Sequence, residues 1–96
     1  MIRHTVVFTL KHEAGSAEER DFLESARQLA GIATVEKFEQ LRQVSSKCDH
    51  AFGFSMEFAD QAAYDFYNDH PMHRDFVENR WMREVADFQE IDYQPL

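Results

Sequence analysis

The chain of 96 residues is poor in cysteine, in basic residues and in long apolar runs. Its one cysteine, Cys48, excludes an intrachain disulfide and fits a reducing cytoplasm, which is the location we expect. Ten Lys and Arg stand against eighteen Asp and Glu, and the net charge of −8 argues against nucleic acid or an anionic membrane as a partner. No segment approaches the ~20 apolar residues of a membrane span, and the first residues lack the pattern of a secretion signal.

Glycine is also scarce. The three glycines form no glycine-rich loop that could hold a phosphate. What the chain does contain is apolar, since hydrophobic residues make up 44% and nine are Phe, which is ample for a packed core. A chain of this length forms one core, so we assign residues 1–96 to a single domain.

Alternation of apolar and polar residues predicts four strands, over residues 2–11, 35–44, 52–58 and 87–94. A first helix should begin after Ser16, because Ser16 and Glu19 have the spacing of a capping box in which each side chain satisfies the other's backbone N–H. Gly31 is a natural stop for it. The apolar stripe of this helix consists of Phe22, Leu23, Ala26, Leu29 and Ala30.

The second helical region should be broken in two. Asp60 is a suitable N-cap for a helix with Ala63, Phe66 and Tyr67 on its inward face. Pro71 lacks a backbone N–H and restricts the residue before it, so the chain must bend near His70 and begin a new helix. That helix places four apolar residues inward, Phe76, Val77, Trp81 and Val85.

The order β-α-β-β-α-β predicts an α+β domain of the ferredoxin-like type, with one antiparallel sheet and helices on one of its faces. The other face would carry small and mixed residues, Thr5, Val7, Thr9, Gly53 and Ser55. Such a face is too apolar for free solvent, and packing against the sheet of a second copy would cover it. We therefore expect a homodimer.

The chain resembles the Dabb family, the stress-responsive dimeric α/β-barrel domain, over essentially its whole length. The resemblance implies that two ferredoxin-like subunits join their sheets into a barrel. Its most specific part is a His-Pro-x-His element after a helix that ends in Tyr. The segments that carry it are Ile2-Arg3-His4, Phe58-Ala59-Asp60, Tyr67, His70-Pro71-Met72-His73 and Ile91-Asp92-Tyr93.

A plant cyclase of this family closes a polyketide ring. The resemblance implies that its catalytic tyrosine and histidine fall on Tyr67 and His73, with a supporting histidine at His4. Phe52 stands where that cyclase has a further histidine. The implied site is a pocket between sheet and helices that takes a small hydrophobic or aromatic ligand.

Each candidate also has a structural interpretation. His4 lies on the apolar row of its strand, so it is either a hydrogen-bonded core histidine or part of a polar corner with Tyr67 and His73. Tyr67 either packs its ring in the core or polarises a substrate carbonyl while His73 removes a neighbouring proton. Two functional classes stay open: an enzyme or binding protein for a small molecule, and a non-catalytic, stress-related dimer.

Two further functions are weaker alternatives. His70 and His73, with Asp69 and Asp75 nearby, suggest a metal site, but Pro71 separates the two histidines and no third ligand has a suitable spacing. We therefore predict that His70 braces the bend, and we expect neither a metal nor a cofactor. Trp81, Asn68 and Asn79 raise the alternative of a cofactor-independent monooxygenase, although the position of Trp81 on its helix favours a core role.

Overall fold

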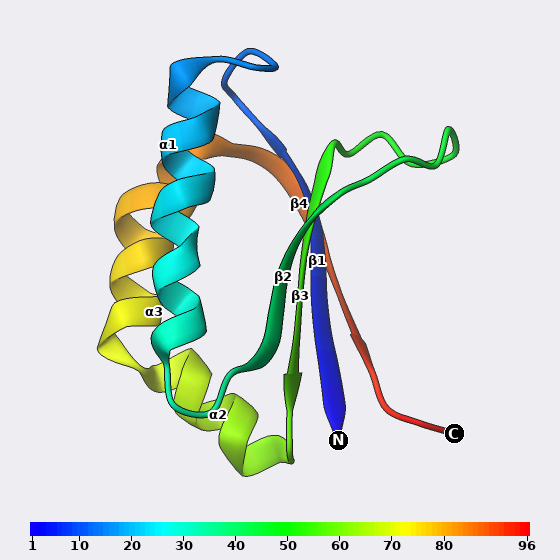
Figure 1. The fold of residues 1–96 in the computed structure, drawn as a ribbon, viewed down its shortest axis with the longest axis vertical. Coiled ribbons are helices and arrows are strands. Elements are labelled where there is room, and N and C mark those ends of the chain that lie inside the picture. The colour runs from blue at the N-terminus through cyan, green and yellow to red at the C-terminus, as the bar shows by residue number, and fades with distance from the viewer.

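A computed structural model describes residues 1–96 as one sheet with all of its helices on one side (Figure 1). The elements in chain order are β1 (Ile2–Leu10), α1 (Ala17–Ala26), a 3-10 turn η1 (Arg27–Gly31), β2 (Glu36–Arg42), β3 (Phe52–Phe58), α2 (Gln61–Asp69), α3 (Pro71–Phe76), a π-helical turn η2 (Val77–Trp81), α4 (Met82–Glu84) and β4 (Val85–Tyr93). This order confirms the predicted β-α-β-β-α-β arrangement, with its second helical region interrupted.

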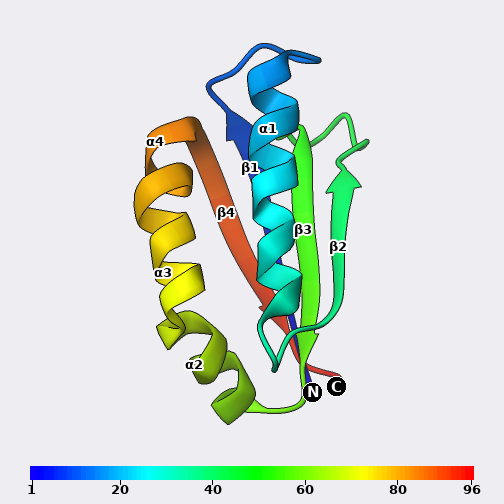
Figure 2. The same ribbon diagram turned by 60° about the vertical axis from the view of Figure 1, so that its left-hand side comes forward.

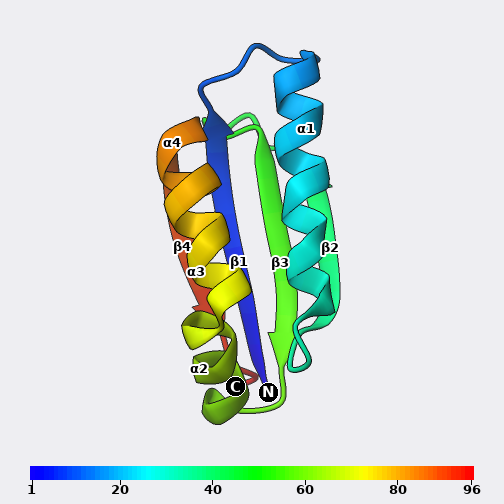
Figure 3. The ribbon, with the colours of Figure 1, turned by 90° about the vertical axis from the view of Figure 1, so that its left-hand side faces the viewer.

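The four strands are antiparallel and lie in the order β2-β3-β1-β4. The first and last strands of the chain are therefore neighbours, and both termini lie at the same end of the sheet (Figure 1). Figures 2 and 3 show α1 in front of β3, while α2, α3 and α4 run along the β1 and β4 side. The helix-facing side of β1 and β4 is thus where residues from both ends of the chain meet.

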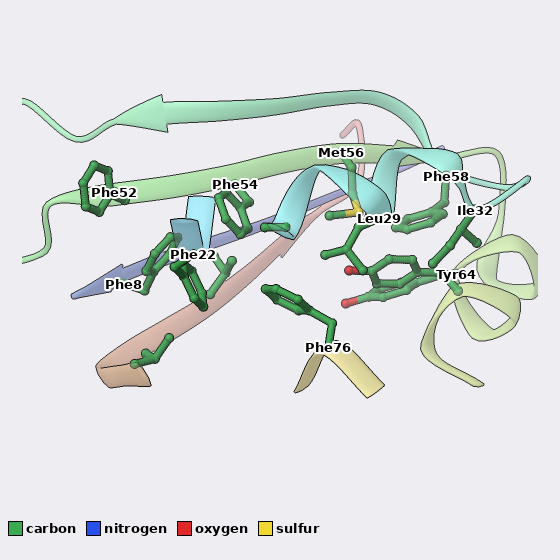
Figure 4. Packing of buried hydrophobic residues seen from close by; sticks show 14 of the residues in the cluster. Phe8, Phe22, Leu29, Ile32, Phe52, Phe54, Met56, Phe58, Tyr64 and Phe76 are labelled. Carbon is green, nitrogen blue, oxygen red and sulfur yellow. The ribbon is translucent and has the colours of Figure 1, made fainter. Parts of the chain in front are cut away.

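The core forms between the helices and one face of the sheet, because alternate residues of β1 and β3 all point to that face. Phe8 of β1 pairs in register with Phe52, and Val6 pairs with Phe54. Phe58 at the end of β3 stacks on Tyr64 of α2 with an interplanar angle of 2° and ring centres 4.9 Å apart (Figure 4). The predicted alternation of β3 is confirmed, since Phe52, Phe54, Met56 and Phe58 are all buried.

Helix α1 begins as predicted but with a different partner for Glu19. The backbone N–H of Glu19 donates to Ser16 Oγ at 3.2 Å, as in a capping box. The Glu19 carboxylate, however, accepts from the N–H of Gly15 rather than Ser16, because Ser16 N already donates to a loop carbonyl. The apolar stripe also ends earlier than expected: Ala30 is exposed, since the last residues tighten into the turn η1, which ends at Gly31.

The break between α2 and α3 is confirmed. Asp60 caps α2 through the N–H of Ala63 at 2.9 Å, and α2 ends one residue before His70. His70 has an extended backbone, and its Nδ1 accepts the N–H of Met72 at 3.1 Å, so it caps the helix that Pro71 begins. The bend redirects the chain without leaving the helix ends unsatisfied.

The prediction for Phe66 was wrong. Its side chain is 50% exposed, and the residues that α2 turns inward are Tyr64 and Tyr67. These two are three positions apart and lie on one helix face, whereas Phe66 lies beside that face. The predicted inward face of α2, which included Phe66 and Tyr67, is therefore rotated by part of a turn from the face that is buried.

Two strand boundaries also differ from the prediction. Residue 85 already belongs to β4, so Val85 is buried as a strand residue and not as the end of a helix. The second strand is shorter than residues 35–44 and has an irregular register between Glu36 and Glu39. Lys37, within that irregularity, has φ 52°, a left-handed backbone that a β-bulge accommodates.

The face of the sheet away from the helices has no covering element within the chain (Figure 1). It carries Thr5 and Val7, together with three larger side chains that are exposed, Leu41, Ile91 and Tyr93. The outer face is thus more apolar than the five predicted residues implied.

No helix of this chain has the length and the apolar composition that a membrane span requires.

Candidate functional site

A cavity of about 220 Å³ lies between the helix-facing side of the sheet and the second helical region. A dry cavity of about 150 Å³ admits benzene, so this one has room for a single substituted ring. Its lining combines polar groups at one end with a mostly apolar wall. The lining residues are His4, Val6, Leu29, Phe54, Met56, Tyr67, His73, Phe76, Val77, Trp81, Met82, Phe88 and Glu90.

The three site residues predicted from the sequence all line this cavity. His4 comes from the inner row of β1, Tyr67 from the inner face of α2, and His73 from the first turn of α3. The ring centres of His4 and Tyr67 are 6.2 Å apart, and those of Tyr67 and His73 are 4.3 Å apart. The bend at His70 is what brings α2 and α3 side chains to the same space.

Tyr67 is 3% exposed, and its hydroxyl forms no hydrogen bond within the protein; because no fully buried side-chain oxygen lacks a partner, the hydroxyl is accessible from the cavity that Tyr67 lines. Burial, helped by the negative charge of Glu90, raises the pKa of Tyr67 above that of an ordinary phenol. The hydroxyl therefore stays protonated at neutral pH and can donate a hydrogen bond to a molecule in the cavity.

One ring nitrogen of His73 forms a hydrogen bond within the protein, and the other does not. Its Nδ1 lies 3.1 Å from the backbone oxygen of Asn68, and because a carbonyl only accepts, Nδ1 carries the proton. The lone pair is then on Nε2. Burial lowers the pKa of His73 below the usual value for histidine, against the opposing effect of the Asn68 hydrogen bond. A neutral imidazole with a free Nε2 can accept a proton.

His4 is oriented by two residues that the sequence analysis did not assign to the site. Its Nδ1 lies 2.6 Å from Asp92 Oδ1 and 2.8 Å from the Tyr64 hydroxyl. The Tyr64 hydroxyl in turn donates to Asp92 Oδ2 at 2.9 Å. The carboxylate fixes the Nδ1–H tautomer, as an acidic partner does for many functional histidines. His4 is thus both a satisfied buried histidine and part of the cavity wall.

The register of the sheet, and not the residue pattern of the last strand, determines that Asp92 and Glu90 face the helices. His4 pairs with Asp92 and Val6 pairs with Glu90, so both acids lie on the helix-facing row of β4. Simple alternation would have turned the apolar residues Ile91 and Tyr93 inward. The acidic row faces the cavity because β1, with His4 inward, sets the register of its neighbour.

Trp81 combines the expected core role with a place in the cavity wall. Its ring packs against Phe8 with centres 5.0 Å apart and against Phe88 at 5.5 Å. It ends the π-helical turn η2, a distortion that often marks functional sites. Phe88 and Met82, which are largely exposed, continue the wall toward solvent.

The histidine pair around the bend does not form a metal cluster. His70 caps α3, while His73 turns to the Asn68 carbonyl. No three His, Cys, Asp or Glu side chains come close enough together to hold a metal ion. Cys48 is a free thiol in the loop before β3.

The fold and the residues described above are those of a known family. The family model described as "Stress responsive A/B Barrel Domain", Dabb, matches residues 2–95. The chain therefore belongs to the Dabb family, as the resemblance in the sequence indicated.

Solved structures agree with this assignment. A Dabb family protein with a ferredoxin-like fold from Mesorhizobium loti is 64% identical, with a TM-score of 0.98 over 99% of this chain and 96% of that one. Two more distant similarities show the fold alone. A dimeric ferredoxin-like protein of unknown function from Thermobifida fusca is 17% identical, with a TM-score of 0.80 over 98% of this chain and 90% of that one. The hydroxynitrile lyase of Passiflora edulis is 12% identical, with a TM-score of 0.80 over 96% of this chain and 90% of that one. No curated protein matches the chain in sequence.

Proposed function

We propose that the protein binds a small organic molecule in the cavity between sheet and helices and transfers a proton there, with Tyr67 and His73 as the reacting pair and His4 in support. The observation that carries this proposal is the Tyr67 hydroxyl, which forms no hydrogen bond within the protein and belongs to a side chain that lines the cavity. Since no fully buried side-chain oxygen lacks a partner, this hydroxyl is accessible from the cavity. It is therefore available to donate a hydrogen bond to a ligand that carries an acceptor.

The chemistry best suited to this pair is proton abstraction next to a carbonyl. The Tyr67 hydroxyl donates to the carbonyl oxygen, and Nε2 of His73 takes a proton from the adjacent carbon. The C–H electron pair moves into the new C=C bond as the carbonyl electrons shift to oxygen, where the phenol stabilises the developing charge. Return of the proton to another carbon atom, or attack of the enolate within the same molecule, would give the product.

Relatives offer precedents for such chemistry. The sequence resembles olivetolic acid cyclase, in which an equivalent tyrosine and histidine act in ring closure. The hydroxynitrile lyase of Passiflora edulis shares the fold and is an enzyme. Since similar folds carry different activities, the site residues and not the fold support the proposal.

We also propose that the protein is a cytoplasmic homodimer in which two outer sheet faces meet. The exposed Leu41, Ile91 and Tyr93 support this, together with the small residues between them. Neighbouring structures from Thermobifida fusca and Bacteroides fragilis are described as dimeric. A cytoplasmic location fits the single, free thiol of Cys48.

Binding of acetophenone tests the ligand site, because this compound is a single ring with one carbonyl. Titration followed by NMR should shift the ring protons of Tyr67 and His73, and Tyr67→Phe should weaken binding by roughly fivefold or more, since one hydrogen bond is lost. Tyr93→Phe, which removes the same hydroxyl from an exposed residue on the outer face, outside the cavity lining, is the matched control. Shifts confined to the outer sheet face, or equal affinity in Tyr67→Phe, would favour the non-catalytic dimer instead.

A further inference from the structure

The cavity has an unusual balance of charge. Glu90 lines it from the inner row of β4 and forms neither a hydrogen bond nor an ion pair with any other side chain. Asp92, two residues further on the same row, is occupied by His4 and Tyr64. Glu90 is an exposed residue, so its side chain lies without a counter-charge at the solvent-facing edge of the apolar space.

No Lys or Arg lines the cavity. Arg80, which precedes the lining residue Trp81, is paired elsewhere, since its guanidinium pairs with Glu84 at 2.6 Å and Asp21 at 2.8 Å. The negative charge of Glu90 acts on both members of the reacting pair. It adds to the rise that burial causes in the pKa of Tyr67, and it opposes in part the fall that burial causes in the pKa of His73. An anionic ligand would thus meet repulsion and no compensating cation.

The wall next to Glu90 is aromatic. Phe88 precedes Glu90 by two positions on the same inner row, and its ring packs edge-on against Trp81 with centres 5.5 Å apart. Phe54 lies 6.3 Å from Trp81 between ring centres on the other side. Electron-rich ring faces beside a carboxylate form the usual environment for an organic ammonium group.

The geometry points to a small arylalkyl amine, bound as its ammonium ion, as the ligand class of this cavity, with Glu90 as the residue that selects its charge. The inference rests on the ligand site proposed above and adds the charge of the ligand to it. The apolar wall holds the ring, Glu90 and the faces of Trp81 and Phe88 hold the ammonium group, and the strongly acidic surface attracts cations toward the opening.

Three probes of nearly equal size separate charge from shape: 2-phenylethylamine, 2-phenylethanol and phenylacetate. Their dissociation constants are measured by NMR titration of the full chain at neutral pH and low salt. The amine should bind about tenfold more tightly than the alcohol, and the carboxylate should bind most weakly. In Glu90→Gln the amine should bind within about twofold of the alcohol, because the ion pair is gone.

Glu36→Gln is the matched control, since it removes the same charge from an exposed position on β2, outside the cavity. It should leave the order of the three probes unchanged. Equal binding of amine and alcohol by the wild type, or an unchanged preference in Glu90→Gln, would overturn the inference while leaving the ligand site intact. Failure of all three probes to bind would overturn the ligand site and the inference together.

Discussion

The rings of Tyr67 and His73 lie with their centres 4.3 Å apart and their planes inclined by 45°, across the bend between α2 and α3. Tyr67 lies in the last turn of α2 and His73 in the first turn of α3, so the contact exists because Pro71 begins a new helix. The Asn68 carbonyl fixes Nδ1 of the imidazole from the end of α2. The broken helix therefore sets both the distance and the tautomer.

Titration of the histidines by NMR should find the pKa of His73 below the usual value of about 6.5. Burial is the main cause, because it disfavours the charged imidazolium. The histidine resonances of the urea-unfolded chain serve as the comparison. A pKa for His73 at or above the unfolded value would contradict the proposed role as a neutral base.

The same shift makes the stability depend on pH with a defined sign. A histidine whose pKa is lower in the folded state binds fewer protons there than in the unfolded chain. His73 should therefore lower the free energy of unfolding as the pH falls from about 6.5 through its folded pKa, and have no such effect above that range. Denaturant melts of wild type and His73→Gln across this range measure it, and the fall should be smaller in the variant.

Two neighbouring tyrosines should respond oppositely to the loss of a hydroxyl. Tyr64→Phe removes a donor and acceptor shared by His4 and Asp92, so the free energy of unfolding should fall by about 1–3 kcal/mol. Tyr67→Phe removes a hydroxyl without a partner, so stability should be nearly unchanged or slightly higher. Thermal melting compares them directly. A large loss in Tyr67→Phe would mean that its hydroxyl has a structural partner.

Phe54 lies on the inner row of β3 and is 3% exposed. Phe54→Ala should lower the free energy of unfolding by about 3–5 kcal/mol, through lost burial and the cavity left behind. Glu57 on the outer face forms partly exposed ion pairs with Arg3 and Lys37, so Glu57→Gln should cost less than about 1 kcal/mol. Equal costs in urea melts would contradict the assignment of the two sheet faces.

Light scattering at micromolar concentration should give twice the chain mass of 11.3 kDa. Ile91→Lys, in the outer face, should return the monomer mass, because an ammonium group would be buried against the second sheet. Phe66→Lys replaces another exposed apolar residue, on α2 and away from the outer face, and should leave the dimer intact. A wild-type monomer would remove the paired sheets from the proposal, leaving the fold unaffected.

The sequence was sufficient for the elements that depend on local signals. Period-two alternation located β1 and β3, and the residues around Ser16, Asp60 and Pro71 located the helix starts. Local signals were insufficient where contacts with neighbouring elements determine which way a side chain points. Phe66 could not be placed because a helix stripe tolerates a shift of part of a turn, and β4 alone gives no reason for its acids to face inward.

The candidate site was predictable to a similar degree. Local signals and the family resemblance together predicted the three residues that line the cavity. The alternation of the first strand placed His4 inward, the inner helix face placed Tyr67, and the bend at Pro71 placed His73. Asp92 required the long-range pairing of β1 with β4, in which His4 and Asp92 lie 88 positions apart, and Tyr64 required the packing of α2 against the sheet. Trp81 lies in the cavity wall at the end of a π-helical turn, and no residue pattern predicted that turn.

Exchange of the methyl protons of acetophenone for deuterium in heavy water tests the central claim most directly, because it reports proton removal next to a carbonyl and nothing else. Followed by NMR at constant pH, the wild type should accelerate exchange over buffer, whereas Tyr67→Phe and His73→Ala should each lower the acceleration at least about tenfold with melting temperatures close to that of the wild type. Tyr64→Phe should retain more of the acceleration despite its lower stability. Exchange that is no faster with wild-type protein than with His73→Ala would contradict the claim that this pair transfers a proton.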